Sequence, residues 1–222
     1  MGARYILLIY FQYNKRSEGD GTWIVKITLF YTCSKDKEYN KAGTPLGLAY
    51  LAGALSDHGF SDVEIAVDED YVIHSKPDVV GISSYSGTYT QSIQAAHKIK
   101  KALDIPIIIG GTHISTLPES LDPIFDVGVV GEGEFAFPEL LTVYQNNNWN
   151  FGTLSSVPGV VLMNAEGIPH ITLSRPLEME LDRISKPRRD VLNPYWPSLK
   201  QRIQFLRYSH RAKQRARKLQ GQ

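Results

Sequence analysis

The sequence predicts an α/β protein built on a doubly wound, five-stranded parallel sheet of the flavodoxin-like or Rossmann-like class. Three observations predict this fold. Between Trp23 and Asn147, short apolar runs alternate with stretches of helical spacing. The apolar runs are continuous Val/Ile segments, which are typical of strands buried on both faces. Gly and hydroxyl residues follow the runs, as turns between strand and helix require. Right-handed crossovers then favour the strand order 2-1-3-4-5.

The elements follow in chain order from this pattern. Strands are expected at 23–32, 63–67, 78–83, 105–111 and 126–131. Helices are expected at 46–59, 90–103, within 115–121 and at 134–148. Thr44 is a candidate N-cap of the first helix, Pro45 suits its first turn, and Gly59 is expected to end it. The acidic segment 68–76 is predicted to be a solvated loop.

Four regions are expected along the chain. Residues 1–22 form an N-terminal extension or an extra strand, with Tyr5–Phe11 as the strand. Residues 23–150 form the α/β domain. Residues 151–198 combine a hairpin at 157–173 with a segment rich in Pro and charge, which is typical of a linker. Residues 199–222 form a basic tail with eight Lys or Arg and no Asp or Glu.

Composition excludes several classes of function. The net charge of +1 gives no overall sign of an acidic or basic partner. The basic tail is one short run without a recognisable nucleic-acid-binding fold, so nucleic acid is not the expected partner. The single cysteine, Cys33, excludes an internal disulfide and an iron–sulfur cluster made by this chain alone. No apolar run reaches the roughly 20 residues that span a bilayer, so no membrane partner is expected. A reducing cytoplasm is the expected compartment.

Glycines, hydroxyls and carboxylates gather after three predicted strands. Because parallel strands end at one edge of the sheet, these residues are expected to lie together at that edge. Backbone N–H groups there suit amides or a phosphate, although turn chemistry alone accounts for any single loop. The candidates are Ser83, Ser84, Tyr85 and Thr88 after the third strand, Gly110, Gly111, Thr112 and His113 after the fourth, and Gly131, Glu132, Gly133 and Glu134 after the fifth.

The stretch GEGEFA, residues 131–136, also matches the dinucleotide pattern G-x-G-x-x-A. It follows the fifth strand rather than the first, and no acidic residue lies about 20 positions further on. Its two carboxylates would also repel a pyrophosphate. No histidine pair has metal-ligand spacing, no serine lies in a nucleophile elbow, and no catalytic acid–base pair is evident.

Taken together, four stretches resemble the cobalamin-binding domain that precedes the catalytic core of class B radical S-adenosylmethionine enzymes. The stretches are TPLGLAYLAGALSDHGF, PDVVGISSYSGTYTQSIQAAHKIKK, IPIIIGGTHISTLPESL and DVGVVGEGEFAFPELL. The later SRPLEMELDRISKPRRDVLN resembles the connector to that core. The resemblance covers roughly residues 23–195, and the Gly-Gly-Thr-His and Gly-Glu-Gly-Glu motifs are its most specific part.

The resemblance implies that cobalamin lies on the carboxyl edge of the sheet, with its nucleotide tail beside the fourth and fifth strands. Gly110 and Gly111 would leave a channel for the tail, Ser83, Ser84 and Thr88 would line it, and residues 131–134 would flank it. It also implies that the cofactor carries a methyl group or tunes a radical step. The 4Fe–4S cluster and S-adenosylmethionine would belong to a core that this chain lacks.

Two motifs of related proteins are absent. No histidine has an aspartate two positions before it, so the D-x-H-x-x-G motif that supplies an imidazole to cobalt is missing. The C-x-x-x-C-x-x-C cluster motif is missing too. The chain is therefore expected to be a cobalamin-binding module without its core, as a truncated protein, an excised fragment or a stand-alone module. The alternatives are a Rossmann-like nucleotide-binding protein and a ligand-free interaction domain whose tail recruits a partner.

Overall fold

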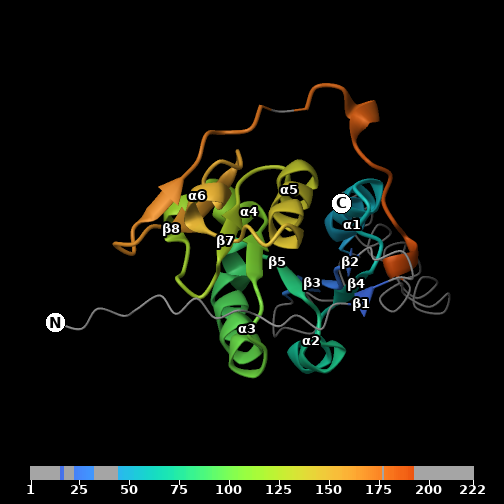
Figure 1. Ribbon diagram of the computed structural model, residues 1–222, viewed down its shortest axis with the longest axis horizontal. Helices are drawn as coiled ribbons and strands as arrows, with labels where there is room; N and C mark the ends of the chain where they lie inside the picture. Colours follow the sequence, from blue (N-terminus) through green and yellow to red (C-terminus); the bar gives the residue numbers. More distant parts are fainter. Residues whose placement is uncertain (1–15, 18–22, 33–44, 177, 193–222) are drawn as a thin grey trace, which may run out of the picture.

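A seven-stranded mixed sheet forms the centre of the molecule in the computed structural model, which describes residues 16–17, 23–32, 45–176 and 178–192. The strand order is β4-β3-β5-β6-β7-β8-β9 (Figure 1). The strands from β3 to β7 are parallel, in the order 2-1-3-4-5 that the sequence predicts. The predicted hairpin pairs with β7 and adds two antiparallel strands, giving seven strands instead of five.

The strands and helices have the following bounds. The strands are β1 Arg16–Ser17, β2 Trp23–Ile24, β3 Ile27–Tyr31, β4 Val63–Ala66, β5 Val79–Ser83, β6 Ile107–Gly110, β7 Val127–Val129, β8 Val160–Met163 and β9 Pro169–Ile171. The helices are α1 Leu46–Asp57, α2 Glu69–Ser75, α3 Tyr89–Ala102, α4 Thr112–Thr116, α5 Gly133–Gln145 and α6 Phe151–Leu154. Short 3-10 turns lie at Ser86–Thr88, Pro118–Ser120, Leu181–Arg183 and Asp190–Leu192.

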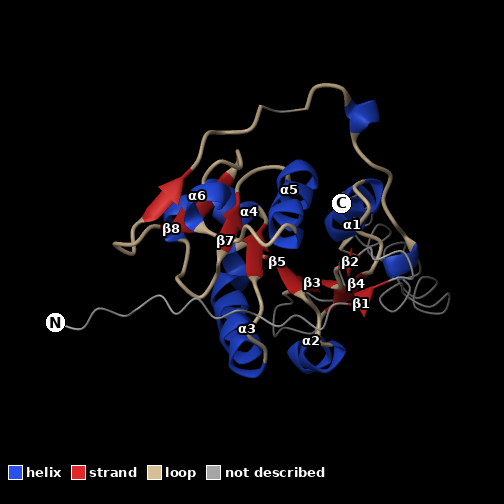
Figure 2. Cartoon of the chain, in the orientation of Figure 1, coloured by secondary structure: helices blue, strands red, loops and turns tan. Residues whose placement is uncertain are grey.

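Helices cover both faces of the sheet (Figure 2). Because side chains alternate along a strand, successive residues of each buried strand enter opposite layers of the core. Ile108 packs in the layer with α1 and α5, whereas Ile107 and Ile109 pack in the layer with α2, α3 and α4. The continuous isoleucine run of β6 is therefore buried on both sides, as expected for a central parallel strand.

Two local predictions are wrong. The acidic segment 68–76 contains helix α2 rather than a loop, because the Asp68 side chain accepts a hydrogen bond from Tyr71 N and caps the helix. The first predicted strand is divided into β2 and β3, and β2 pairs with β1 in a separate two-stranded sheet. Gly59, with φ of +88°, follows α1 as predicted.

Some predictions lie outside the described residues: the Tyr5–Phe11 strand, the Thr44 cap, Cys33 and the basic tail at 199–222. Within the described part of the chain, no helix is long and apolar enough to cross a membrane. The connector after the hairpin has the composition of a linker, but its end is packed against the domain. It passes from β9 to the far side of α1 (Figure 1), where Val191 and Leu192 are buried.

Candidate functional site

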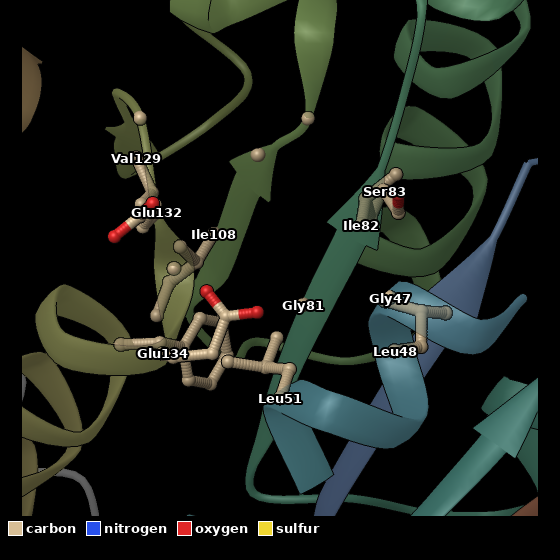
Figure 3. Close-up of a pocket in the computed structure, with 15 residues that line it drawn as sticks. Gly47, Leu48, Leu51, Gly81, Ile82, Ser83, Ile108, Val129, Glu132 and Glu134 are labelled. Atoms are coloured by element: carbon tan, nitrogen blue, oxygen red, sulfur yellow. The ribbon is translucent and has the colours of Figure 1, made fainter. Parts of the chain in front are cut away.

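A pocket of about 330 Å³ lies between the carboxyl half of the sheet and helices α1 and α5. Strand register explains its position. Ser83 on β5 pairs with Gly110 on β6, and Gly81 pairs with Ile108, so these four residues share the sheet face that α1 and α5 cover. The lining residues are Gly47, Leu48, Leu51, Gly81, Ile82, Ser83, Ile108, Gly110, Gly111, Val129, Gly131, Glu132, Gly133, Glu134 and Phe137 (Figure 3).

The adjacent glycines 110 and 111 have different roles. A Cβ added to Gly110 would meet only the Val129 Cβ, at 3.8 Å, so this position borders open space. Gly111 has φ of +103° and ψ of −175°, a conformation that only glycine adopts readily. A Cβ there would overlap the Ser84 carbonyl oxygen. Gly110 therefore leaves room in the pocket, whereas Gly111 permits the close approach of two backbone segments.

Three further glycines keep the pocket rim free of side chains. A Cβ added to Gly47 or Gly131 would have no neighbour within 4 Å. At Gly133 a Cβ would meet the Leu51 Cδ1 at 3.7 Å, an ordinary contact. Gly47 lies in the first turn of α1, and Gly133 is the first residue of α5. At Gly47 and Gly133 the two helices thus present bare backbone to the pocket.

The floor of the pocket is apolar. The Phe137 ring lies directly on the β5 backbone at Gly81, where a Cβ would come within 2.8 Å of the ring. Ile108 and Val129, both buried, complete this floor. Gly81 therefore lets the Phe137 ring approach the β5 backbone closely.

Two carboxylates lie beside this apolar floor. Figure 3 shows the Glu134 carboxylate between α5 and Leu51 of α1. Burial raises the pKa of Glu134 above its usual value, and the nearby Glu132 carboxylate raises the pKa further. The pocket can accept hydrogen bonds from amides or hydroxyls, and it disfavours a group of high negative charge. Within the described residues, no cluster of His, Cys, Asp and Glu could hold a metal ion.

Seven of the twelve residues predicted from the sequence line the pocket. They are Ser83, Gly110, Gly111, Gly131, Glu132, Gly133 and Glu134. The other five do not line it: Ser84, Tyr85, Thr88, Thr112 and His113. Ser84 and Thr88 are buried and bond to the Tyr85 carbonyl oxygen, at 3.3 and 3.2 Å. Their hydroxyls hold the turn between β5 and α3.

His113 is enclosed on the opposite face of the sheet. Its Nδ1 lies 3.1 Å from Ser86 Oγ and its Nε2 lies 3.1 Å from Ser120 Oγ. Its ring stacks on Tyr89 with the centroids 3.9 Å apart. The Tyr89 hydroxyl in turn donates to the Ser120 carbonyl oxygen at 2.6 Å. Both ring nitrogens of His113 thus have partners within the α3–α4 layer.

The sequence did not predict that helix α1 lines the pocket, nor did it predict the apolar floor. The missed residues are Gly47, Leu48, Leu51, Gly81, Ile82, Ile108, Val129 and Phe137. Two glycines carried a usable signal. Gly81 interrupts a buried Val/Ile strand, which often marks a close approach, and Gly47 lies in a helix, where glycine is unfavourable. The apolar lining residues carried no such signal, because the same residue types also fill the core.

A family model of the B12 binding domain matches residues 38–141. TokK, a cobalamin-dependent radical SAM methyltransferase of Streptomyces tokunonensis, is 30% identical over 89 residues, which are 38% of this chain and 13% of that protein. The matched region begins before α1 and ends within α5, so it contains all the residues that line the pocket.

Two solved structures share the fold. OxsB, a cobalamin-dependent S-adenosylmethionine radical enzyme solved with aqua-cobalamin and S-adenosylmethionine, has a TM-score of 0.63 and 17% identity, over 76% of this chain and 25% of that chain. The radical S-adenosylmethionine methyltransferase TsrM from Kitasatospora setae has a TM-score of 0.54 and 21% identity, over 68% of this chain and 31% of that chain. The chain thus spans a quarter to a third of these structures. Residues 38–141 form a domain of the B12-binding family, similar to those of cobalamin-dependent radical SAM methyltransferases.

Proposed function

We propose that this chain binds cobalamin and places the nucleotide tail of the cofactor in the pocket between the sheet and helices α1 and α5. The observation that carries the proposal is the open space in front of Gly110, at the carboxyl edge of the central strands. Ligands of doubly wound sheets bind at this edge. When bound, the cofactor would supply methyl transfer or the tuning of a radical step, and the protein would orient it.

The residues around the pocket fit such a ligand. Gly47, Gly110 and Gly131 leave space for a bulky group, and Phe137 offers an apolar surface for an aromatic base. Ser83 and Glu134 offer a hydroxyl and a carboxyl group to the amide and hydroxyl groups of the ligand. None of the pocket-lining residues is a histidine. The pocket therefore supplies no imidazole to the cobalt.

A radical S-adenosylmethionine core is the proposed functional partner. The relatives that share this domain are radical enzymes of which the chain matches only a part. In this proposal the 4Fe–4S cluster and S-adenosylmethionine belong to that core. This chain would hold the cofactor and exclude water from one side of it, and no reaction step is assigned to its own side chains.

The carboxylates argue against the dinucleotide alternative. In that alternative the start of α5, at Gly131–Gly133, would hold a pyrophosphate. Glu132 and Glu134 lie at this helix start, and the raised pKa of Glu134 shows that negative charge is already unfavourable there. A pyrophosphate carries two negative charges, whereas the phosphodiester of the cobalamin tail carries one, so the dinucleotide would meet the stronger repulsion.

Hydroxocobalamin binding tests the proposal. The full chain is mixed with hydroxocobalamin, desalted and examined by visible spectroscopy. We expect a coloured protein, and we expect Gly110→Val to lose the colour because its methyl groups enter the pocket. The control is Ile109→Val, on the same strand but facing the opposite layer, which should bind as the wild type does. A colourless wild-type protein, or a thermal shift with NAD but not with cobalamin, would overturn the proposal.

A further inference from the structure

Helix α1 lies between the pocket and the end of the connector. Leu48 and Leu51 line the pocket on one side of the helix. On another side, Ala49, Gly53 and Ser56 contact residues 185–188, which approach from more than 130 positions along the chain. Residues 185–192 are called the docked segment below. A ligand in the pocket would therefore contact a helix whose other side is held by the docked segment.

Small residues on α1 allow the backbone of the docked segment to approach closely. A Cβ added to Gly53 would overlap the Lys186 carbonyl oxygen and would lie 3.5 Å from the Ser185 Cβ. The neighbouring Ala49 and Ala52 also have small side chains, and both are fully buried. Glycine is unfavourable inside a helix, so its presence in the middle of α1 is explained by this contact rather than by helix stability.

Arg188 makes the specific bonds of the docked segment. Its backbone N–H donates to the Ala49 carbonyl oxygen at 2.9 Å. Its Nη1 donates to Ser56 Oγ at 3.0 Å and to the Ser61 carbonyl oxygen at 2.9 Å. Its Nη2 forms an ion pair with Asp190 at 2.7 Å. One guanidinium thus ties together the helix, the loop that follows the helix and the connector.

The connector is anchored on the second pocket helix as well. Arg175 Nη2 lies 2.6 Å from Glu139 Oε2 on α5. The connector therefore leaves β9, is tied to α5 by Arg175, passes over the top of the molecule in this view and ends beside α1 (Figure 1). At the start of α1, as far as the described residues go, the N-cap Pro45 makes no side-chain capping bond.

We infer that Arg188 is a positioning residue, which holds α1 against the sheet and thereby couples docking of segment 185–192 to occupation of the pocket. This inference rests on the proposed binding of cobalamin. Coupling of this kind is reciprocal: a docked segment tightens ligand binding, and a bound ligand tightens docking by the same factor. The connector is then part of the binding domain, and its position reports whether the cofactor is present.

The test compares two arginines of the same connector. Arg188→Ala removes the side-chain bonds to Ser56 on α1 and to the Ser61 carbonyl oxygen, and it keeps the backbone bond to Ala49. Arg183→Ala removes an equal charge whose ion-pair partner, Glu178, lies within the connector. We expect Arg188→Ala to bind hydroxocobalamin about tenfold more weakly than the wild type. Arg183→Ala should bind within twofold of the wild type.

Hydrogen exchange measures the reverse direction of the coupling without any variant. The amide of Arg188 is bonded to α1, so its exchange reports docking. In the wild type, hydroxocobalamin should slow exchange across 185–192 by about the same tenfold factor. In Gly110→Val, which blocks the pocket, added hydroxocobalamin should leave this exchange unchanged.

The outcomes separate this inference from the proposed function. A wild type that binds no cobalamin overturns the proposed function and, with it, the coupling. A wild type that binds cobalamin but whose 185–192 exchange does not change overturns the coupling alone. Equal affinities for Arg188→Ala and Arg183→Ala would also overturn it. If Arg188→Ala does not fold, the exchange measurement on the wild type decides.

Discussion

The two faces of the sheet differ at the carboxyl edge of β5 and β6. On the α1–α5 face, Ser83 and Gly110 border an open pocket with few polar side chains. On the α3–α4 face, His113 and its serine partners form a closed network with no pocket-lining residue. The two faces are separated by only one strand thickness.

This difference shows which residues leave room for a ligand. Serine, threonine and histidine after a strand suggest a polar site, but most of those at this edge bond to one another or to the backbone. Turn chemistry accounts for them, because a tight connection needs partners for its own polar groups. Glycines in regular elements are more informative, since they weaken a helix or strand and need another explanation.

Gly111→Ala should cause the largest loss of stability, and it tests whether the two adjacent glycines have different roles. The alanine Cβ would overlap the Ser84 carbonyl oxygen in a backbone conformation reserved for glycine. We expect the free energy of unfolding in urea to fall by about 3 kcal/mol. Gly110→Ala is the matched control, and its stability should stay within about 0.5 kcal/mol of the wild type. Equal losses for both would mean that the two glycines share one role.

His113→Ala tests whether the closed face is structural. The change removes two hydrogen bonds and the stacking contact with Tyr89 from a buried site. We expect a loss of about 2 kcal/mol in urea unfolding, with hydroxocobalamin affinity within twofold of the wild type. The assay is run at a temperature where the variant is fully folded. A large loss of affinity at unchanged stability would return His113 to the site that the sequence predicts.

The sequence was sufficient for the fold and for the edge at which the pocket lies. Apolar runs with intervening helical periods determine parallel strands, and crossover handedness limits their order. It was insufficient to choose the face, because that choice depends on register: whether Gly110 or Ile109 faces α1 changes with a shift of one residue. The docked segment was also missed, since bonds such as that between Arg188 and Ser56 leave no local pattern.

Glu134→Gln measures how much stability the protein loses by keeping a carboxylate on the open face. Burial, together with the nearby Glu132 carboxylate, raises the pKa of Glu134 in the folded protein above its ordinary value of 4.5. Between the ordinary and the raised pKa, the folded state binds more protons than the unfolded state, so stability falls as pH rises through this range. The penalty is complete above the raised pKa and absent well below 4.5. Glutamine does not ionise and avoids the penalty.

We therefore expect Glu134→Gln to raise Tm by about 2 °C at pH 7.5 and to match the wild type near pH 4. Glu166→Gln, an equal change of charge in the exposed β8–β9 turn, should leave Tm unchanged at both pH values. An increase in Tm that persists unchanged at pH 4 would show that the gain comes from packing rather than from ionisation. A gain confined to neutral pH would mean that the chain tolerates a partly buried carboxylate although it lowers stability. Such a cost is expected where a side chain serves a ligand rather than the fold.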